Sequence, residues 1–190
     1  MNLRKAVIVL AVTLFFVSCS SLRFKIPNED AQIENNIYNQ YLSIADSYYN
    51  LQNYTKAIEY YKLALKNKDN YWNTYYKIAR CYALSNNWIE AENYYTVLLE
   101  RDPSNAALKS SVAYIYANTN KTDEALKIYD ELIEQYPEVS EYLENKISIL
   151  LLQDKIKESE KLFSHLKETF PDSKKIETIQ NAIDSKKKSN

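Results

Sequence analysis

The sequence predicts an all-α protein, a solenoid of four helical hairpins followed by a C-terminal capping helix. The first observation is a phrase that returns every 34 residues, as AIEYYKLAL from Ala57, AENYYTVLL from Ala91 and ALKIYDELI from Ala125. The second is a proline that returns at the same interval, at positions 103, 137 and 171. Since one hairpin cannot bury both of its apolar faces, repeats of this length must stack on one another.

The repeat divides residues 38–173 into four blocks without an insertion: 38–71, 72–105, 106–139 and 140–173. Small residues recur at positions 8 and 20 of a block, and an aromatic residue recurs at position 24. The recurring residues are Ala45, Ala79 and Ala113, then Ala57, Ala91 and Ala125, and finally Tyr61, Tyr95, Tyr129 and Phe163. This pattern resembles the tetratricopeptide repeat, and the resemblance implies two antiparallel helices in each block.

Helical spacing of apolar residues supports the same hairpin in the first block. The residues expected to be buried are Tyr41, Ile44, Ala45 and Tyr48 in the first helix and Ile58, Tyr61, Leu63, Ala64 and Leu65 in the second. The turns within the hairpins read LQN, SNN, NTN and LQD. Asparagine is expected to take the left-handed conformation that glycine usually supplies there. The recurring prolines are expected to end the second helices.

The two ends of the repeat region differ from its middle. Lys146, Ile147 and Ser159 stand in the fourth block where the pattern favours an apolar and two small residues, which is typical of a terminal repeat. Residues 174–185 are expected to form a capping helix with Ile176, Ile179 and Ile183 on one face, and residues 186–190 a solvated basic tail. At the front, Ile33 and Ile37 continue the stripe of Tyr41, so the helical region is expected to span residues 29–173.

Residues 1–18 have the layout of a secretory signal, in which a basic start precedes an apolar run too short to span a bilayer. The sequence FVSC that follows resembles the lipobox of bacterial lipoproteins. This resemblance implies cleavage before Cys19, lipidation of Cys19, and a tether over residues 19–28. The alternative is ordinary signal cleavage after Ser20, which discards Cys19. We expect a lipid-anchored protein of the cell envelope, at the outer membrane and facing the periplasm.

The composition argues against an enzyme. None of the 190 residues is glycine, which excludes glycine-rich loops that cradle phosphate. The single histidine, His165, has no cysteine, serine or paired carboxylate placed by the pattern to use it, and Cys81 is expected to be a small core residue. The 24 basic and 25 acidic residues of the protein are mixed along the chain, which argues against nucleic-acid binding. We therefore expect no catalytic residue, no metal, no cofactor and no small-molecule substrate.

The resemblance to tetratricopeptide repeats also implies a concave groove, lined by positions 2, 5, 6, 9, 12 and 13 of the first helices, that holds partner segments. Among these positions we expect partner contacts from Asp46, Tyr49, Asn73, Tyr76, Lys77, Arg80, Tyr114 and Asn118. For the three tyrosines the alternative is ordinary surface or inter-repeat packing. Asp46 and Arg80 share position 9 and are expected to pair across the groove, either as a simple exposed ion pair or as a recognition element. Trp88 is expected in the core.

One ligand class of the family is excluded by the residues present. Chaperone-binding relatives hold a carboxylate with lysines, an arginine and asparagines at set positions of three repeats. The corresponding residues here are Leu42, Asp46, Lys77, Ala107 and Ser111, which cannot form that clamp. C-terminal chaperone tails are therefore not the expected ligands.

Together these features predict a membrane-anchored protein–protein interaction scaffold of the bacterial cell envelope, whose partners are other envelope proteins. The chain also resembles the tetratricopeptide lipoproteins that assist the assembly of outer-membrane β-barrel proteins, with YP and FPDS helix ends among the shared features. That resemblance implies a role in the same process. The alternative is a regulator or localisation factor of a peptidoglycan enzyme, and self-association through the exposed end of the first repeat is also open.

Overall fold

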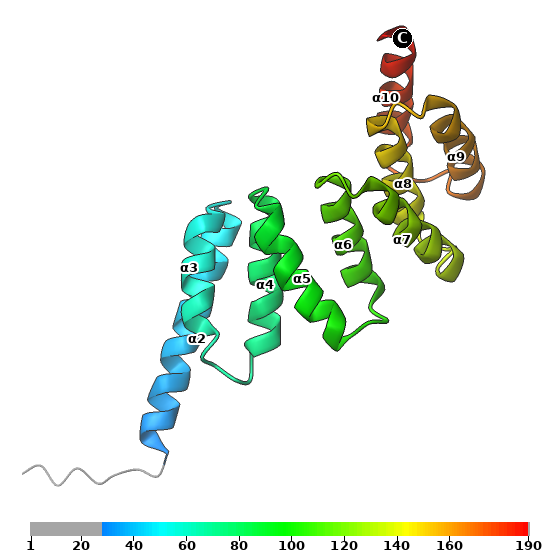
Figure 1. The fold of residues 1–190 in the computed structure, drawn as a ribbon. Helices are drawn as coiled ribbons and strands as arrows, with labels where there is room; N and C mark the ends of the chain where they lie inside the picture. The colour runs from blue at the N-terminus through cyan, green and yellow to red at the C-terminus, as the bar shows by residue number, and fades with distance from the viewer. Residues whose placement is uncertain (1–27, 190) are drawn as a thin grey trace, which may run out of the picture. The chain divides into compact units, whose positions relative to one another are not determined.

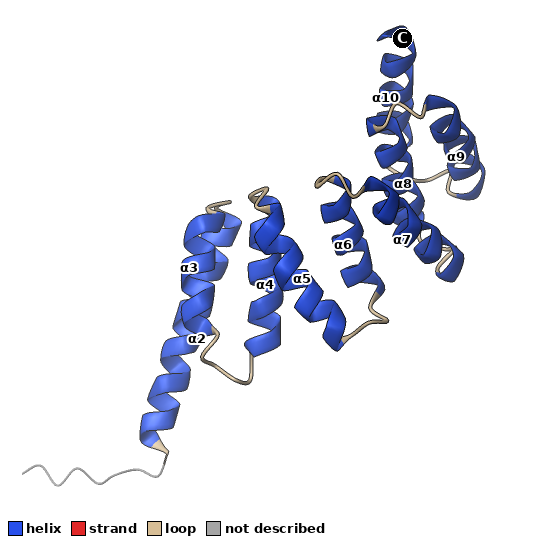
Figure 2. Ribbon diagram, in the orientation of Figure 1, coloured by secondary structure: helices blue, strands red, loops and turns tan. Residues whose placement is uncertain are grey.

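The computed structural model describes residues 28–189, and every regular element in that part of the chain is an α-helix (Figures 1 and 2). In chain order the helices are α2 (Glu29–Asn50), α3 (Tyr54–Ala64), α4 (Tyr71–Leu84), α5 (Trp88–Arg101), α6 (Ala106–Ala117), α7 (Thr122–Gln135), α8 (Ser140–Leu152), α9 (Ile156–Thr169) and α10 (Ile176–Ser189). Tyr38–Asn190 forms one compact unit, and the start of α2 belongs to a separate one. The predicted leader, Cys19 and all but the last residue of the tether lie outside the described residues.

Consecutive helices pack side by side from α3 to α10 (Figure 1). The pairs α4–α5, α6–α7 and α8–α9 are the hairpins of blocks two to four, and α3–α4, α5–α6 and α7–α8 join neighbouring hairpins. All six alanines at positions 8 and 20 are completely buried: Ala45, Ala57, Ala79, Ala91, Ala113 and Ala125. A larger side chain there would overpack the helix contact at a cost of about 1–3 kcal/mol. The predicted all-α solenoid is confirmed.

The turn inside every hairpin places one residue in the left-handed region, always at position 15 of the block. These residues are Gln52, Asn86, Asn120 and Asp154, with φ between 56° and 61°. In the first block the prediction of asparagine was wrong, because glutamine takes this conformation. Asn53 has φ −85° and directly precedes α3, and its side chain accepts a hydrogen bond from the Lys56 amide at 3.2 Å. The asparagine therefore acts as a helix N-cap in this block.

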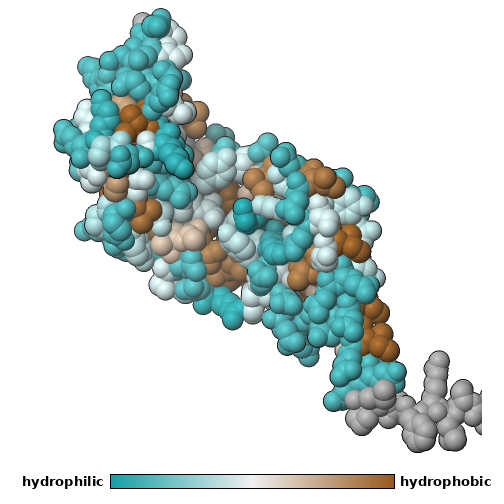
Figure 3. Space-filling view, turned by 180° about the vertical axis from the view of Figure 1, so that it is seen from behind, coloured by the Kyte–Doolittle hydropathy of each residue, from teal (hydrophilic) through white to brown (hydrophobic). Residues whose placement is uncertain are grey.

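The buried face of the first block is narrower than its apolar pattern suggests. Ala57, Ile58, Tyr61 and Ala64 are buried as expected, but Ile44 is 39% and Leu63 43% exposed. Leu63 follows Tyr61 by two residues, which turns it about 200° around the helix and away from the buried stripe. The expectation of a buried Leu63 and Ile44 was therefore wrong. Exposed apolar residues of this kind appear as brown areas on a largely hydrophilic surface in Figure 3.

The fourth block accommodates its unusual residues in the packing of its hairpin. Ile147 and Ser159 are completely buried, and the Ser159 hydroxyl donates a hydrogen bond to the Ile156 carbonyl at 2.7 Å, which satisfies it within its own helix. Lys146 pairs with Asp130 of α7. Burial of a hydroxyl costs little free energy when the hydroxyl has a hydrogen-bond partner in its own helix, which explains why serine is tolerated at a small-residue position.

Helix α10 packs on α8 and α9 through its isoleucine face. Ile179 and Ile183 are buried in one apolar cluster, and Ile176 is partly buried against it. The helix extends beyond the expected end at residue 185 and includes the three lysines expected in a solvated tail. Two of them form ion pairs, Lys186 with Asp154 and Lys187 with Glu160. Positive charge in the last turn also interacts favourably with the helix dipole.

Candidate functional site

A first hollow lies over α2, α3 and α4 and has a volume of about 280 Å³. It is lined by Asp46, Tyr49, Asn50, Tyr61, Lys77 and Arg80. Five of these six residues occupy positions 9, 12, 13 and 6 of first helices, which the family resemblance implied as groove positions. The sixth, Tyr61, comes from position 24 of a second helix and forms part of the lining from beneath.

Asp46 connects three helices at the base of this hollow. Its carboxylate accepts two hydrogen bonds from the Lys77 ammonium, at 2.6 and 2.8 Å, and one from the Tyr61 hydroxyl at 2.5 Å. Burial raises the pKa of Tyr61 strongly, and the adjacent Asp46 charge raises it further. The expected pair of Asp46 with Arg80 is wrong, because Lys77, three residues before Arg80 on α4, forms the ion pair with Asp46 instead.

Arg80 lies on the groove face of α4 with its guanidinium over the ring of Tyr49, 5.5 Å from the ring centroid. The Tyr49 ring is itself held edge-on against Tyr54 at 5.8 Å. Stacking on a fixed aromatic ring restricts the guanidinium without using its hydrogen-bond donors. Arg80 forms no ion pair with any residue of the described chain.

A second, larger hollow of about 490 Å³ adjoins the first, since Arg80 lines both. Its lining comes from α4 to α8 and the turn after α4: Arg80, Ala83, Leu84, Asn86, Tyr95, Ser110, Ser111, Tyr114, Tyr129, Glu141 and Asn145. The Tyr129 hydroxyl donates to the Ser110 carbonyl at 3.2 Å and accepts from the Asn145 amide at 3.4 Å. Burial raises the pKa of Tyr95 to about 12, against opposing effects of a hydrogen bond with Ser111 and of the Arg80 charge.

Five of the eight residues expected to contact a partner line these hollows: Asp46, Tyr49, Lys77, Arg80 and Tyr114. The other three lie outside both. Tyr76 is partly buried and packs edge-on against Tyr95 with 6.1 Å between ring centroids. Asn118 is the C-cap of α6 and donates to the Tyr114 carbonyl at 2.8 Å, while Asn73 is exposed on α4.

The residues that sequence reasoning missed are the tyrosines at position 24. Tyr61, Tyr95 and Tyr129 are at most 3% exposed, as expected of core anchors, yet each reaches a hollow. The available signal was the use of tyrosine in place of phenylalanine, since a buried hydroxyl requires a polar partner. Trp88 was expected in the core; it is partly buried, packs against a core cluster, and its ring meets the exposed Tyr114 ring at 5.9 Å.

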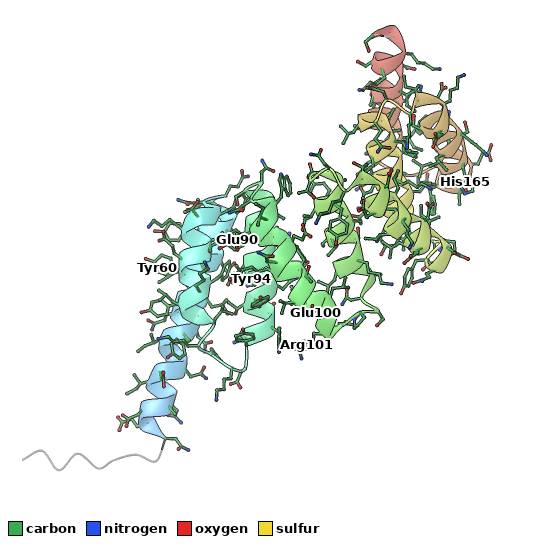
Figure 4. The ribbon with its side chains drawn as sticks, viewed as in Figure 1. Tyr60, Glu90, Tyr94, Glu100, Arg101 and His165 are labelled. Atoms are coloured by element: carbon green, nitrogen blue, oxygen red, sulfur yellow. The ribbon has the colours of Figure 1, made fainter. Side chains whose placement is uncertain are left out.

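The remaining reactive side chains do not line either hollow. Cys81 is completely buried, as expected, and burial raises the pKa of its thiol to about 11. His165 is exposed on α9 (Figure 4), with its Nδ1 3.4 Å from the Thr169 hydroxyl. Within residues 28–189, no group of three or more histidine, cysteine, aspartate or glutamate side chains is arranged to hold a metal ion. No helix in the same range is both long and apolar enough to cross a membrane.

A stack of helical hairpins with a hollowed face of first helices is a protein–protein interaction scaffold. Family comparison agrees, because residues 84–146 and residues 42–106 each match a tetratricopeptide repeat model. The two matches together span more than half of the chain. The chain belongs to the tetratricopeptide repeat family. Proteins of this family are generally non-catalytic binding scaffolds.

Several solved structures have a fold similar to that of this chain, at low sequence identity. A tetratricopeptide repeat protein from Parabacteroides merdae has a TM-score of 0.63 at 17% identity, and the match covers 80% of this chain and 60% of that protein. MamA from Desulfovibrio magneticus has a TM-score of 0.63 at 14% identity, covering 72% and 77%. YrrB, described as a tetratricopeptide protein with an unusual peptide-binding site, has a TM-score of 0.53 at 18% identity, covering 69% and 68%. No curated protein matches the chain.

Proposed function

We propose that this protein is a membrane-anchored scaffold of the bacterial cell envelope that binds an extended segment of a partner protein along its two hollows. The observation that carries the proposal is that the two hollows share Arg80 in their linings and together extend over first helices from α2 to α8. A surface of this kind suits a chain that crosses several helices better than a compact small molecule, and the protein itself performs no catalysis.

The chemistry of the lining supports an extended peptide as ligand. Tyrosine rings offer rigid contact area, while serine hydroxyls and asparagine amides offer donors and acceptors to the peptide groups of a bound strand. YrrB, which shares this fold, is described as having a peptide-binding site, and this makes peptide binding a reasonable proposal here.

The membrane anchor is proposed from the sequence. Acylation of Cys19 would hold the protein on a bilayer, since each buried methylene of an acyl chain contributes about 0.8 kcal/mol. Intact-mass measurement of the mature protein extracted from membranes tests this directly. A mass equal to that of a chain that starts at Cys19 and carries acyl groups supports the anchor. A mass without acyl groups excludes it.

Within the envelope, we propose assistance to the assembly of outer-membrane proteins as the process served, with regulation of a peptidoglycan enzyme as the alternative. The two differ in what a deletion strain would lose. Depletion of β-barrel proteins from the outer membrane supports assembly. Altered digestion products of the cell wall with normal barrel levels support the alternative.

Site-specific photo-crosslinking in intact membranes tests the groove itself. The probe replaces Tyr114, which is 53% exposed at the second hollow, and the control probe replaces Lys127, which is exposed on the second helix α7. A discrete product at Tyr114 but not at Lys127, identified by mass spectrometry, supports groove binding and names the pathway. Products at Lys127 alone, or at neither position, refute it.

A further inference from the structure

The charges that line the two hollows are not evenly compensated. Asp46 and Lys77 neutralise each other through two short hydrogen bonds. The other acidic residue of the lining, Glu141, belongs to α8 and lines only the second hollow. Arg80 remains as a cation without a carboxylate partner in the described chain, at the one position common to both hollows.

Arg80 is also prepared for binding. Its guanidinium is stacked on Tyr49, which limits the conformational freedom that binding would otherwise cost. The Tyr95 and Tyr114 side chains line the same hollow, and a tyrosine hydroxyl can donate a hydrogen bond to an anionic group. A planar guanidinium with free donors matches a carboxylate in two parallel hydrogen bonds.

We propose that Arg80 is a specificity-determining residue of the groove and binds an aspartate or glutamate side chain within the partner segment. This inference rests on the proposed function and adds the chemistry of the ligand. The carboxylate belongs to an internal residue and not to a chain terminus, because the hollows continue on both sides of Arg80, toward α2 and toward α8. A segment that occupies both hollows passes Arg80 in its middle.

The test is a selection of random linear peptides, displayed without a free C-terminus, against the full mature chain. Bound peptides are first sorted by whether they block photo-crosslinking at Tyr114. We expect the groove-binding peptides to share an acidic residue at one fixed position. The same selection on Arg80→Glu is expected to replace this residue by lysine or arginine.

Arg101 provides a matched control, because its guanidinium also stacks on an aromatic ring, 4.3 Å from the centroid of Trp72, but at the end of α5 outside both hollows (Figure 4). Arg101→Glu should select the same acidic peptides as the wild type. For one selected peptide, Arg80→Gln should weaken binding about tenfold or more, as expected for loss of a charge-assisted pair, while Arg101→Gln leaves it unchanged. Circular dichroism checks that each variant is folded.

The outcomes separate this inference from the function on which it rests. Groove-binding peptides that lack an acidic preference, or keep it in Arg80→Glu, overturn the role of Arg80 and leave peptide binding intact. The selection is repeated with a second library displayed with a free C-terminus, and an acidic preference that appears only in that second library overturns the internal position. If no peptide competes at Tyr114, groove binding fails, and the role of Arg80 fails with it.

Discussion

Replacement of Tyr61 by phenylalanine isolates the hydrogen bond that joins α3 to the Asp46 carboxylate. The substitution removes one hydroxyl from a ring that is 1% exposed and leaves its shape almost unchanged. The lost bond is 2.5 Å long, and its acceptor is ionised. Hydrogen bonds to charged groups contribute about 1.5–3 kcal/mol, and the Asp46 side chain is 42% exposed, so water can partly replace the bond. We expect a loss of about 1–2 kcal/mol at neutral pH.

The same variant should show a characteristic dependence on pH. The pKa of Tyr61 is raised above its ordinary value of 10.0 in the folded protein, first by burial and then by Asp46. A raised pKa contributes stability that is fully present below the unfolded value and is lost as the pH rises above it, because the unfolded tyrosine ionises first. The stability difference between wild type and Tyr61→Phe should therefore shrink as the pH rises beyond 10.

Urea unfolding followed by circular dichroism at several pH values measures this difference. Tyr95 and Tyr129 also have raised pKa values, but both remain in the variant, so their contribution cancels from the comparison. Asp172→Asn, at an exposed carboxylate in the turn before α10, is a control that should change stability by less than about 0.5 kcal/mol. A difference that stays constant or grows above pH 10 would refute the reasoning about Tyr61.

Three further variants test other features. Gln52→Gly should stabilise the protein by about 0.5–1 kcal/mol because it relieves a left-handed glutamine, whereas Gln40→Gly inside α2 should cost about 1 kcal/mol; equal losses in urea unfolding would contradict this. Asn105→Ala removes the N-cap of α6, which accepts from the Leu108 amide at 3.1 Å, and should cost about 1 kcal/mol in the same assay. Burial favours the protonated form of Glu144, but hydrogen bonds from Ser173, Ser140 and Lys175 outweigh this effect and lower the pKa of the carboxyl. The stability that ionised Glu144 contributes is therefore present above its ordinary pKa of 4.5 and is lost as the pH falls through the pKa of the folded protein. The stability cost of Glu144→Gln should therefore shrink on acidification, and a cost that is independent of pH would argue against the ion pair that Glu144 forms with Lys175 at 3.3 Å.

Local features of this fold could be predicted from the sequence, and features that depend on contacts between distant residues could not. The repeat length and the small residues at positions 8 and 20 were readable from the sequence, because each depends on residues within a few helical turns. The breadth of the buried face was not, as the exposed Ile44 and Leu63 show. Gln52 was missed as the left-handed turn residue because Asn53, the expected residue, serves as the N-cap of α3.

The candidate site shows the same division. Groove positions on the first helices were predictable by resemblance, and Tyr49 and Tyr114 do line hollows. The partner of Asp46 was not predictable, because Tyr61 is 15 and Lys77 is 31 residues away, and the choice between Lys77 and Arg80 depends on how α2 and α4 are rotated against each other.

By itself the sequence determined an all-α stack of hairpins, the positions of its alanine contacts and the absence of glycine-dependent sites, because these follow from composition and from periodicity along one helix. Only the tertiary structure decided which charges neutralise each other and that Arg80, which lines both hollows, has no carboxylate partner among residues 28–189. The physical reason is that a side-chain pair forms or fails over a distance of about one ångström. That distance is set by the packing of whole helices and is not encoded in the spacing of residues along the chain.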